Sequence, residues 1–152
     1  MKKSILLLPI ALLVWNIGHA QQKVNYLEIR KDLVKSTCTT TDAEINKQDL
    51  ANLLAIDTTI IGSGLSQYYY DLGMLYYSIF GLSEGQFHPQ AYVCMKRCVE
   101  LDKKNGNAYL NLSIMYYFEK NIFLAKEYAQ LHKKYTRKRD RDHFHLKHIE
   151  SL

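Results

Sequence analysis

The chain has 152 residues, 47% of them hydrophobic, and a formal net charge of +5 at pH 7. This length is enough for one modest domain with a limited core. The positive charge is concentrated near the end, because the segment from Lys133 onward carries +4 while residues 21–132 carry about −1. The overall basic character therefore does not indicate a nucleic-acid partner.

Residues 1–20 have the layout of a cleaved secretory signal. Two lysines precede an apolar run over residues 5–17, and Gly18 and Ala20 supply small side chains where a signal peptidase would cut. The alternative is a retained membrane anchor, but a proline and an asparagine interrupt the run. It also falls short of the roughly 20 apolar residues that a transmembrane helix needs. We therefore expect an exported chain, periplasmic or secreted, that starts at Gln21.

Residues 21–65 are expected to form N-terminal helices. Apolar residues recur at helical spacing and no strand pattern is present, which predicts an all-α protein. A first helix is predicted over residues 23–35 and ends in STCTTT, a run that favours caps and turns. The segment from Thr41 to Glu44 matches a capping box that starts a second helix. The residues that this helix is expected to bury are Ile45, Leu50, Leu53, Leu54 and Ile56.

Four helices are predicted between the glycine-rich break at residues 62–64 and the C-terminal segment. They cover residues 66–80, a stretch that starts at Pro89 and ends near LDKKNG, residues 107–118 and residues 122–135. Proline suits a first-turn position, where its missing amide costs nothing. Residues 136–152 form a basic, His-rich tail in which Phe144, Leu146 and Ile149 could build a short capping helix.

Two of these predicted helices carry nearly the same sequence. Residues 69–77 read YYDLGMLYY and residues 109–117 read YLNLSIMYY, forty positions later. An internal repeat of this kind indicates stacked supersecondary units. Most of the repeated residues are expected to pack inside such a stack.

The two copies resemble the tetratricopeptide repeat (TPR), whose units are antiparallel helix pairs. The first helix of a TPR unit has the consensus W-x₂-L-G-x₂-Y. In this chain the four consensus positions are occupied by Tyr69, Leu72, Gly73 and Tyr76, and again by Tyr109, Leu112, Ser113 and Tyr116. The small second-helix positions match Ala91, Cys98 and Ala125. The first internal loop has six extra residues, and in this it resembles the related Sel1-like repeats, whose helices are joined by a longer loop. The resemblance implies a short α-solenoid of six to seven helices, with two units in residues 66–135 and a degenerate unit in residues 21–65.

In the TPR family, the first helix of each unit lines a concave groove. The resemblance places six residues of this chain there: Tyr70, Met74, Tyr77, Leu110, Ile114 and Tyr117. Such an apolar face would bind a protein partner, with tyrosines supplying rigid contact area. Alternatively, the N-terminal helices or a second copy of the chain cover this face, so a homo-oligomer stays open.

The C-terminal segment offers two weaker candidates for binding. Its basic residues would contact an acidic partner or an anionic envelope surface; they are Lys133, Lys134, Arg137, Lys138, Arg139 and Arg141. His143, His145 and His148 have a spacing that could gather two ligands on a metal. Because the segment is terminal and positively charged, we expect no native metal site. Cys38 could pair with Cys94 or Cys98, or all three could be buried thiols.

No catalytic motif is present, so we expect neither an enzyme nor a cofactor. The sequence favours an exported interaction module that binds another protein through an aromatic groove. The alternative is a small periplasmic inhibitor, such as an immunity protein that blocks a toxin enzyme. Its basic tail could enter an acidic catalytic cleft.

Overall fold

The computed structural model describes residues 23–34, 43–83 and 86–151. Within these ranges the protein is all-α, as predicted, with seven α-helices and two short strand pairs. The helices are α2 (Tyr26–Leu33), α3 (Ala43–Leu54), α4 (Leu65–Phe80), α5 (Pro89–Leu101), α6 (Gly106–Phe118), α7 (Ile122–Tyr135) and α8 (His143–Glu150). The strands are β1 (Val24–Asn25), β2 (Ile61–Ser63), β3 (Leu82–Ser83) and β4 (Gln86–Phe87), and two 3-10 turns lie at Thr58–Ile60 and Lys138–Asp140.

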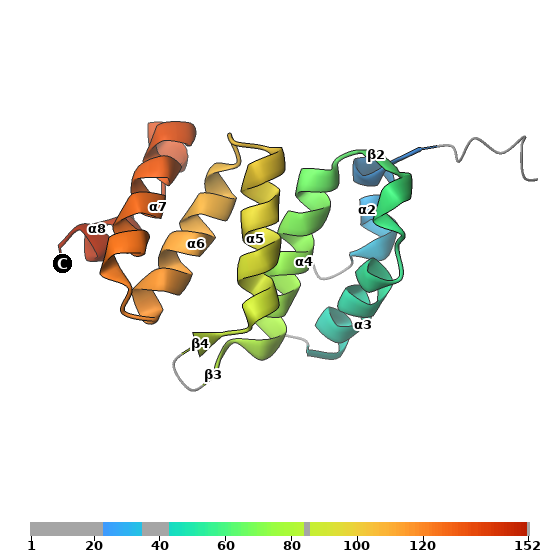
Figure 1. Cartoon of the computed structure of the whole chain (residues 1–152), viewed down its shortest axis with the longest axis horizontal. Coiled ribbons are helices and arrows are strands. Elements are labelled where there is room, and N and C mark those ends of the chain that lie inside the picture. The colour runs from blue at the N-terminus through green and yellow to red at the C-terminus, as the bar shows by residue number, and fades with distance from the viewer. Residues whose placement is uncertain (1–22, 35–42, 84–85, 152) are drawn as a thin grey trace, which may run out of the picture.

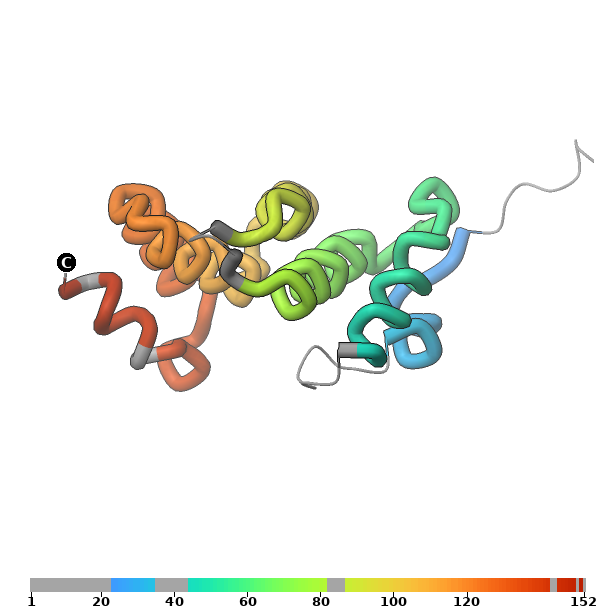
Figure 2. Tube along the Cα trace, turned by 90° about the horizontal axis from the view of Figure 1, so that it is seen from below, coloured from blue at the N-terminus to red at the C-terminus, as the bar shows by residue number. Residues whose placement is uncertain are grey.

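The helices form a row in chain order, from α2 and α3 at one end to α7 and α8 at the other (Figure 1). Helices α4 to α7 alternate in direction, and the closest neighbours in the row are α4 with α5 and α6 with α7. Seen from below, α5 and α7 project to one side of the row, whereas α2 and α8 lie on the other (Figure 2). Helices α4 to α7 therefore form an antiparallel row, with α2 and α3 at one end and α8 at the other.

Side-chain caps explain where most of these helices begin. Asn105 accepts a hydrogen bond from the amide of Ala108, and Asn121 accepts one from the amide of Leu124. His88 caps α5 in the same way, and Pro89 occupies the first turn as predicted. Gly64 precedes α4 with φ of 80°, a left-handed conformation that glycine adopts without steric cost.

The structure adds two strand pairs that the sequence did not predict. β1 runs parallel to β2, with Val24 opposite Ile61, and β3 forms an antiparallel hairpin with β4. The first helix consequently starts at Tyr26, not near residue 23, because the residues before it are extended. The hairpin occupies the loop that carries the six extra residues.

The repeated small residues allow close helix packing. A Cβ atom added at Gly73 would lie 3.0 Å from Met95 Cε and 3.2 Å from Cys94 Cβ, so a larger residue would require these side chains of α5 to shift. At the equivalent position of the second copy, the buried Ser113 hydroxyl donates a hydrogen bond of 2.7 Å to the Ala125 carbonyl. Both small positions therefore lie at the contact with the next helix.

The tyrosines of the second copy take part in a ladder of aromatic rings across α5, α6 and α7. The ladder runs from Tyr92 through Tyr116, Tyr128 and Tyr109 to Tyr135, with centroid separations between 5.2 and 6.2 Å. Such pairs add attraction beyond the burial of apolar area. Tyr109 and Tyr116, the first and last aligned positions of the second copy, thus join α6 to the neighbouring helices.

The prediction for helix α3 and the residues after it is only partly correct, because Leu50 and Ile56 pack against the core but two other predicted residues do not. Leu53 is fully buried, but Ile45 and Leu54 are 39% and 54% exposed. Asn46 and Asp49 are buried instead. Apolar and polar residues alternate along this helix without a clean stripe, so the sequence pattern did not specify its orientation.

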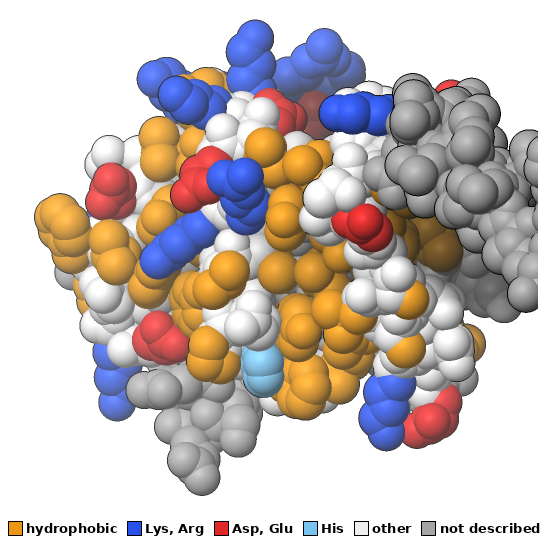
Figure 3. Space-filling view, turned by 45° about the vertical axis from the view of Figure 1, so that its right-hand side comes forward, with side chains coloured by type: hydrophobic (Ala, Val, Ile, Leu, Met, Phe, Trp, Pro, Cys, Tyr) orange, Lys and Arg blue, Asp and Glu red, His pale blue; other side chains and the backbone are white. Residues whose placement is uncertain are grey.

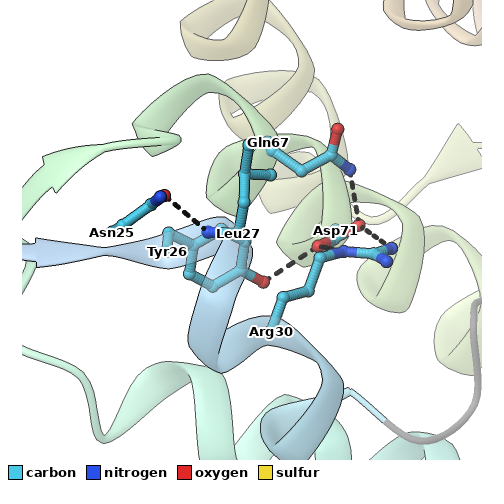
Figure 4. Close-up of polar contacts among 6 residues, drawn as sticks. All are labelled: Asn25, Tyr26, Leu27, Arg30, Gln67 and Asp71. Carbon is cyan, nitrogen blue, oxygen red and sulfur yellow. Dashed lines mark hydrogen bonds and ion pairs between the residues drawn. The ribbon is translucent and has the colours of Figure 1, made fainter.

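A buried carboxylate joins the N-terminal helix to the first repeat copy (Figure 4). Asp71, on α4, is fully buried and accepts two hydrogen bonds from the guanidinium of Arg30 on α2, at 2.5 and 2.8 Å. The hydroxyl of Tyr26 and the amide of Gln67 donate to the same carboxylate, each at 2.9 Å. A buried charge is tolerated only when it is paired and hydrogen-bonded in this way.

The second copy repeats this contact with neutral groups. Asn111 occupies the position of Asp71, and its amide donates to the hydroxyl of Tyr70 at 3.3 Å and to the sulfur of Met74 at 3.1 Å. The contacts from Asp71 to Arg30 and from Asn111 to Tyr70 both span 41 residues. The two polar contacts therefore link α2 to α4 and α4 to α6 at equivalent sequence positions.

Helix α8 lies where the sequence placed a short terminal helix. Its residues Leu146 and Ile149 are buried in the same cluster as Ala125 and Ala129 of α7. The exposed end of the row at α7 is thus partly covered.

We predict that Asp71→Ala lowers the free energy of unfolding by about 3 kcal/mol, because Tyr26 and Arg30 lose a buried partner. The matched change Asn111→Ala, at the equivalent but less buried position, should cost about 1 kcal/mol. Urea denaturation followed by circular dichroism measures both. Equal losses in the two variants would contradict the role assigned to the buried charge.

Candidate functional site: an aromatic pocket between the repeat copies

The structure divides the six predicted groove residues into different environments. Tyr70 and Met74 are half-buried and contact Asn111, so they join α4 to α6. Ile114 is buried at 8% exposure, and Leu110 is half-buried. Tyr77 and Tyr117, the last two positions, are half-buried and each contacts a phenylalanine ring. The six residues therefore do not form one evenly exposed face.

Four aromatic rings gather where α4 and α6 end. The ring of Tyr77 stacks on Phe87 with centroids 4.8 Å apart, and Phe87 meets the edge of Phe118 at 6.1 Å. Phe118 in turn meets the edge of Tyr117 at 5.5 Å. Phe87 belongs to β4, so the extra residues of the first loop place a ring between the two repeat copies.

Three of these rings, those of Tyr77, Phe87 and Phe118, border a pocket of about 320 Å³, called the aromatic pocket below. It is lined by Tyr77, Ser78, Gly81, Phe87 and Phe118. Phe87 is buried, whereas Phe118 is 46% exposed. Burial raises the pKa of the Tyr77 phenol, so this side chain stays neutral over the physiological range. The lining carries no charged side chain, and the pocket is suited to an apolar or aromatic group.

The predicted basic tail is only partly available for binding. Arg141 donates hydrogen bonds to the carbonyls of Lys133 and Thr136, and so caps the C-terminal end of α7. Arg137, Lys138 and Arg139 are exposed. Arg139 lies 3.5 Å from the carboxylate of Asp140. The other two predicted basic residues belong to α7, where Lys133 is half-buried and Lys134 is exposed.

The histidines near the C-terminus are not assembled as ligands in the described part of the chain. His145 Nδ1 lies 2.7 Å from an Asp142 carboxylate oxygen, and Asp142 also accepts from the amide of His145 at the start of α8. His148 is exposed, and the side chain of His143 lies outside the described residues. Among the residues that the structure describes, no group of three or more His, Cys, Asp or Glu could hold a metal ion.

Cys94 and Cys98 are free, buried thiols. Burial raises the pKa of the Cys94 thiol to about 11, so it is not a reactive thiolate near neutral pH. The alternative in which these cysteines act as small hydrophobic residues therefore fits both of them. Cys38 lies outside the described residues.

Another apolar surface lies on the face shown in Figure 3. Hydrophobic side chains form a band down the middle of this view, and Lys and Arg side chains gather along its upper edge. At the C-terminal end of α4, Tyr76 and Phe80 stack on the ring of His88, at 4.9 and 4.5 Å. The molecule thus carries aromatic groups beyond the predicted groove.

Sequence reasoning missed the two phenylalanines of the aromatic pocket, Phe87 and Phe118, as well as Ser78 and Gly81. Phe87 lies in the loop after the predicted helix 66–80, and Phe118 ends the predicted helix 107–118, directly after Tyr117. Asp71 was also missed, although an acidic residue inside the apolar run YYDLGMLYY is itself a signal of a buried polar contact.

No protein-family model, curated protein or solved structure matches the chain. Within the described residues, every helix is too short or too polar to cross a membrane.

We predict that Phe87→Ala lowers the free energy of unfolding by about 3 kcal/mol, because it removes a buried ring that packs between α4 and α6. Phe118→Ala should cost about 1 kcal/mol or less, because this ring is nearly half exposed. Urea denaturation of the two variants tests the difference. If Phe118→Ala is as costly as Phe87→Ala, Phe118 serves mainly the fold.

Proposed function

We propose that the chain is a TPR-like interaction module that binds a protein partner at the aromatic pocket. The observation that carries this proposal is the exposed Phe118 ring beside a neutral pocket whose walls come from both repeat copies. Aromatic residues next to a preformed pocket are typical of the few positions that contribute most to protein binding. The half-buried tyrosines of the predicted groove extend the same contact surface.

The repeated contacts from Asp71 and Asn111 support a stack of three units. On this proposal α2 with α3, α4 with α5 and α6 with α7 are successive helix pairs of a short solenoid. About three units are needed before such a stack is stable. Helix α8 would then cover the last pair.

We also propose that residues 1–20 direct export, on the basis of their charge and apolar pattern. The partner would then be a protein of the periplasm or of the cell's exterior. Exposed Arg137, Lys138 and Arg139 could add an electrostatic contact with an acidic surface.

The proposal predicts that one exposed phenylalanine matters and another does not. The tagged full-length chain is expressed in its source cell, cross-linked, and its captured partners are quantified. Phe118→Ala should reduce capture of the specific partner about tenfold or more. The control Phe123→Ala, on α7 and 78% exposed, should leave capture unchanged.

Capture of only the chain itself would mean that the aromatic surface joins copies of this protein, and the proposed role would be wrong. Equal capture by the Phe118→Ala variant would exclude the aromatic pocket as the binding site. An enzyme that is captured through the basic tail and loses activity would favour the inhibitor alternative.

A further inference from the structure

A second pocket lies next to the aromatic pocket and shares the wall formed by Phe87. It has a volume of about 290 Å³ and is called the carboxylate pocket here. Its lining comes from β4, the start of α5 and the end of α6: Phe87, Pro89, Tyr92, Tyr116 and Glu119. Three aromatic rings and a single carboxylate therefore face one small space.

The carboxylate of Glu119 is partly buried at this pocket. Within the described residues, no nitrogen of a Lys, Arg or His side chain lies within 4.0 Å of it. The neighbouring hydroxyl of Tyr92 is buried and lies next to this carboxylate. Burial, followed by hydrogen bonding to Glu119 and the charge of that carboxylate, raises the pKa of the Tyr92 phenol, which therefore stays neutral. Among the described lining residues, the Glu119 carboxylate thus has a neutral phenol beside it but no positively charged side chain.

The rings of this pocket can also attract a cation. Tyr92 and Tyr116 lie 5.2 Å apart with their planes tilted by 49°. The ammonium of Lys96 already lies 5.7 Å from the centroid of Tyr116, although Lys96 itself is exposed and does not line the pocket. An aromatic face beside a carboxylate is a favourable environment for a positively charged side chain.

We infer that the carboxylate pocket takes a lysine or arginine side chain of the bound partner. An anionic group would be repelled by Glu119, and a purely apolar group would bury that carboxylate without a counter-charge. The inference rests on the proposed function and specifies the partner: its binding segment carries a basic residue close to the apolar residue held by the aromatic pocket. Side chains two positions apart on an extended peptide point to the same side, so they can reach two pockets with a common wall.

The test uses the full-length chain and two peptides, acetyl-Phe-Gly-Lys-amide and the same peptide with norleucine in place of lysine. Affinities are measured by following backbone amide resonances of α5 and α6 in NMR titrations. The lysine peptide should bind about fivefold more tightly than the norleucine peptide. Glu119→Gln, which keeps the size of the side chain and removes its charge, should abolish that preference. Phe118→Ala should weaken both peptides and preserve their ratio.

Equal affinity for the two peptides, or a lysine preference that survives in Glu119→Gln, would overturn the inference and leave the aromatic pocket as the proposed binding site. If neither peptide binds, the inference is also overturned, whereas the capture experiment with Phe118→Ala still decides the proposed function. Tetramethylammonium chloride serves as a further probe. If it binds as tightly as the lysine peptide, the pocket is selective for small quaternary ammonium ions and the assignment to a side chain is wrong.

Discussion

The rest of the structure depends on one buried negative charge. The carboxylate of Asp71 cannot be moved into a dry interior unless Arg30 and Tyr26 accompany it, so helix α2 must lie against α4. This contact fixes one end of the row, and the pairing of β1 with β2 strengthens it. Helix α4 contacts α5 along its length, from Ser66 to Tyr76, and its last turns also meet the hairpin, where Tyr77 stacks on Phe87. The pockets described above are built at that end.

The local signals in the sequence predicted much of the fold. Pro89, Asn121 and the glycines near residue 64 mark helix starts, and α7 spans the predicted residues 122–135 because caps and turns are short-range properties. Contacts between distant residues were not predictable in this way. The pairing of Val24 with Ile61 and the burial of Asn46 in place of Ile45 depend on where α3 and β2 meet the remainder of the chain.

In the candidate site, too, the local positions were predictable and the contacts between distant residues were not. The TPR resemblance placed Tyr77 and Tyr117 on one face, and both lie next to the aromatic rings at the ends of α4 and α6. Phe87 could not be placed, because the register of the six-residue insertion follows from hairpin pairing and not from the repeat. Glu119 ends α6 at a turn where Lys120 has a φ of 61°, and its orientation towards Tyr92 depends on that turn.

The position of Phe87 has a mechanical consequence for the row of helices. Tyr77 belongs to one helix pair and Phe118 to the next, and Phe87 fills the junction between them. A side chain that enters the aromatic pocket would contact both pairs, so it would favour one angle between them over others. Binding free energy would then be linked to the curvature of the stack, and stiffening or bending the junction from elsewhere in the protein would change affinity without altering any contact to the ligand.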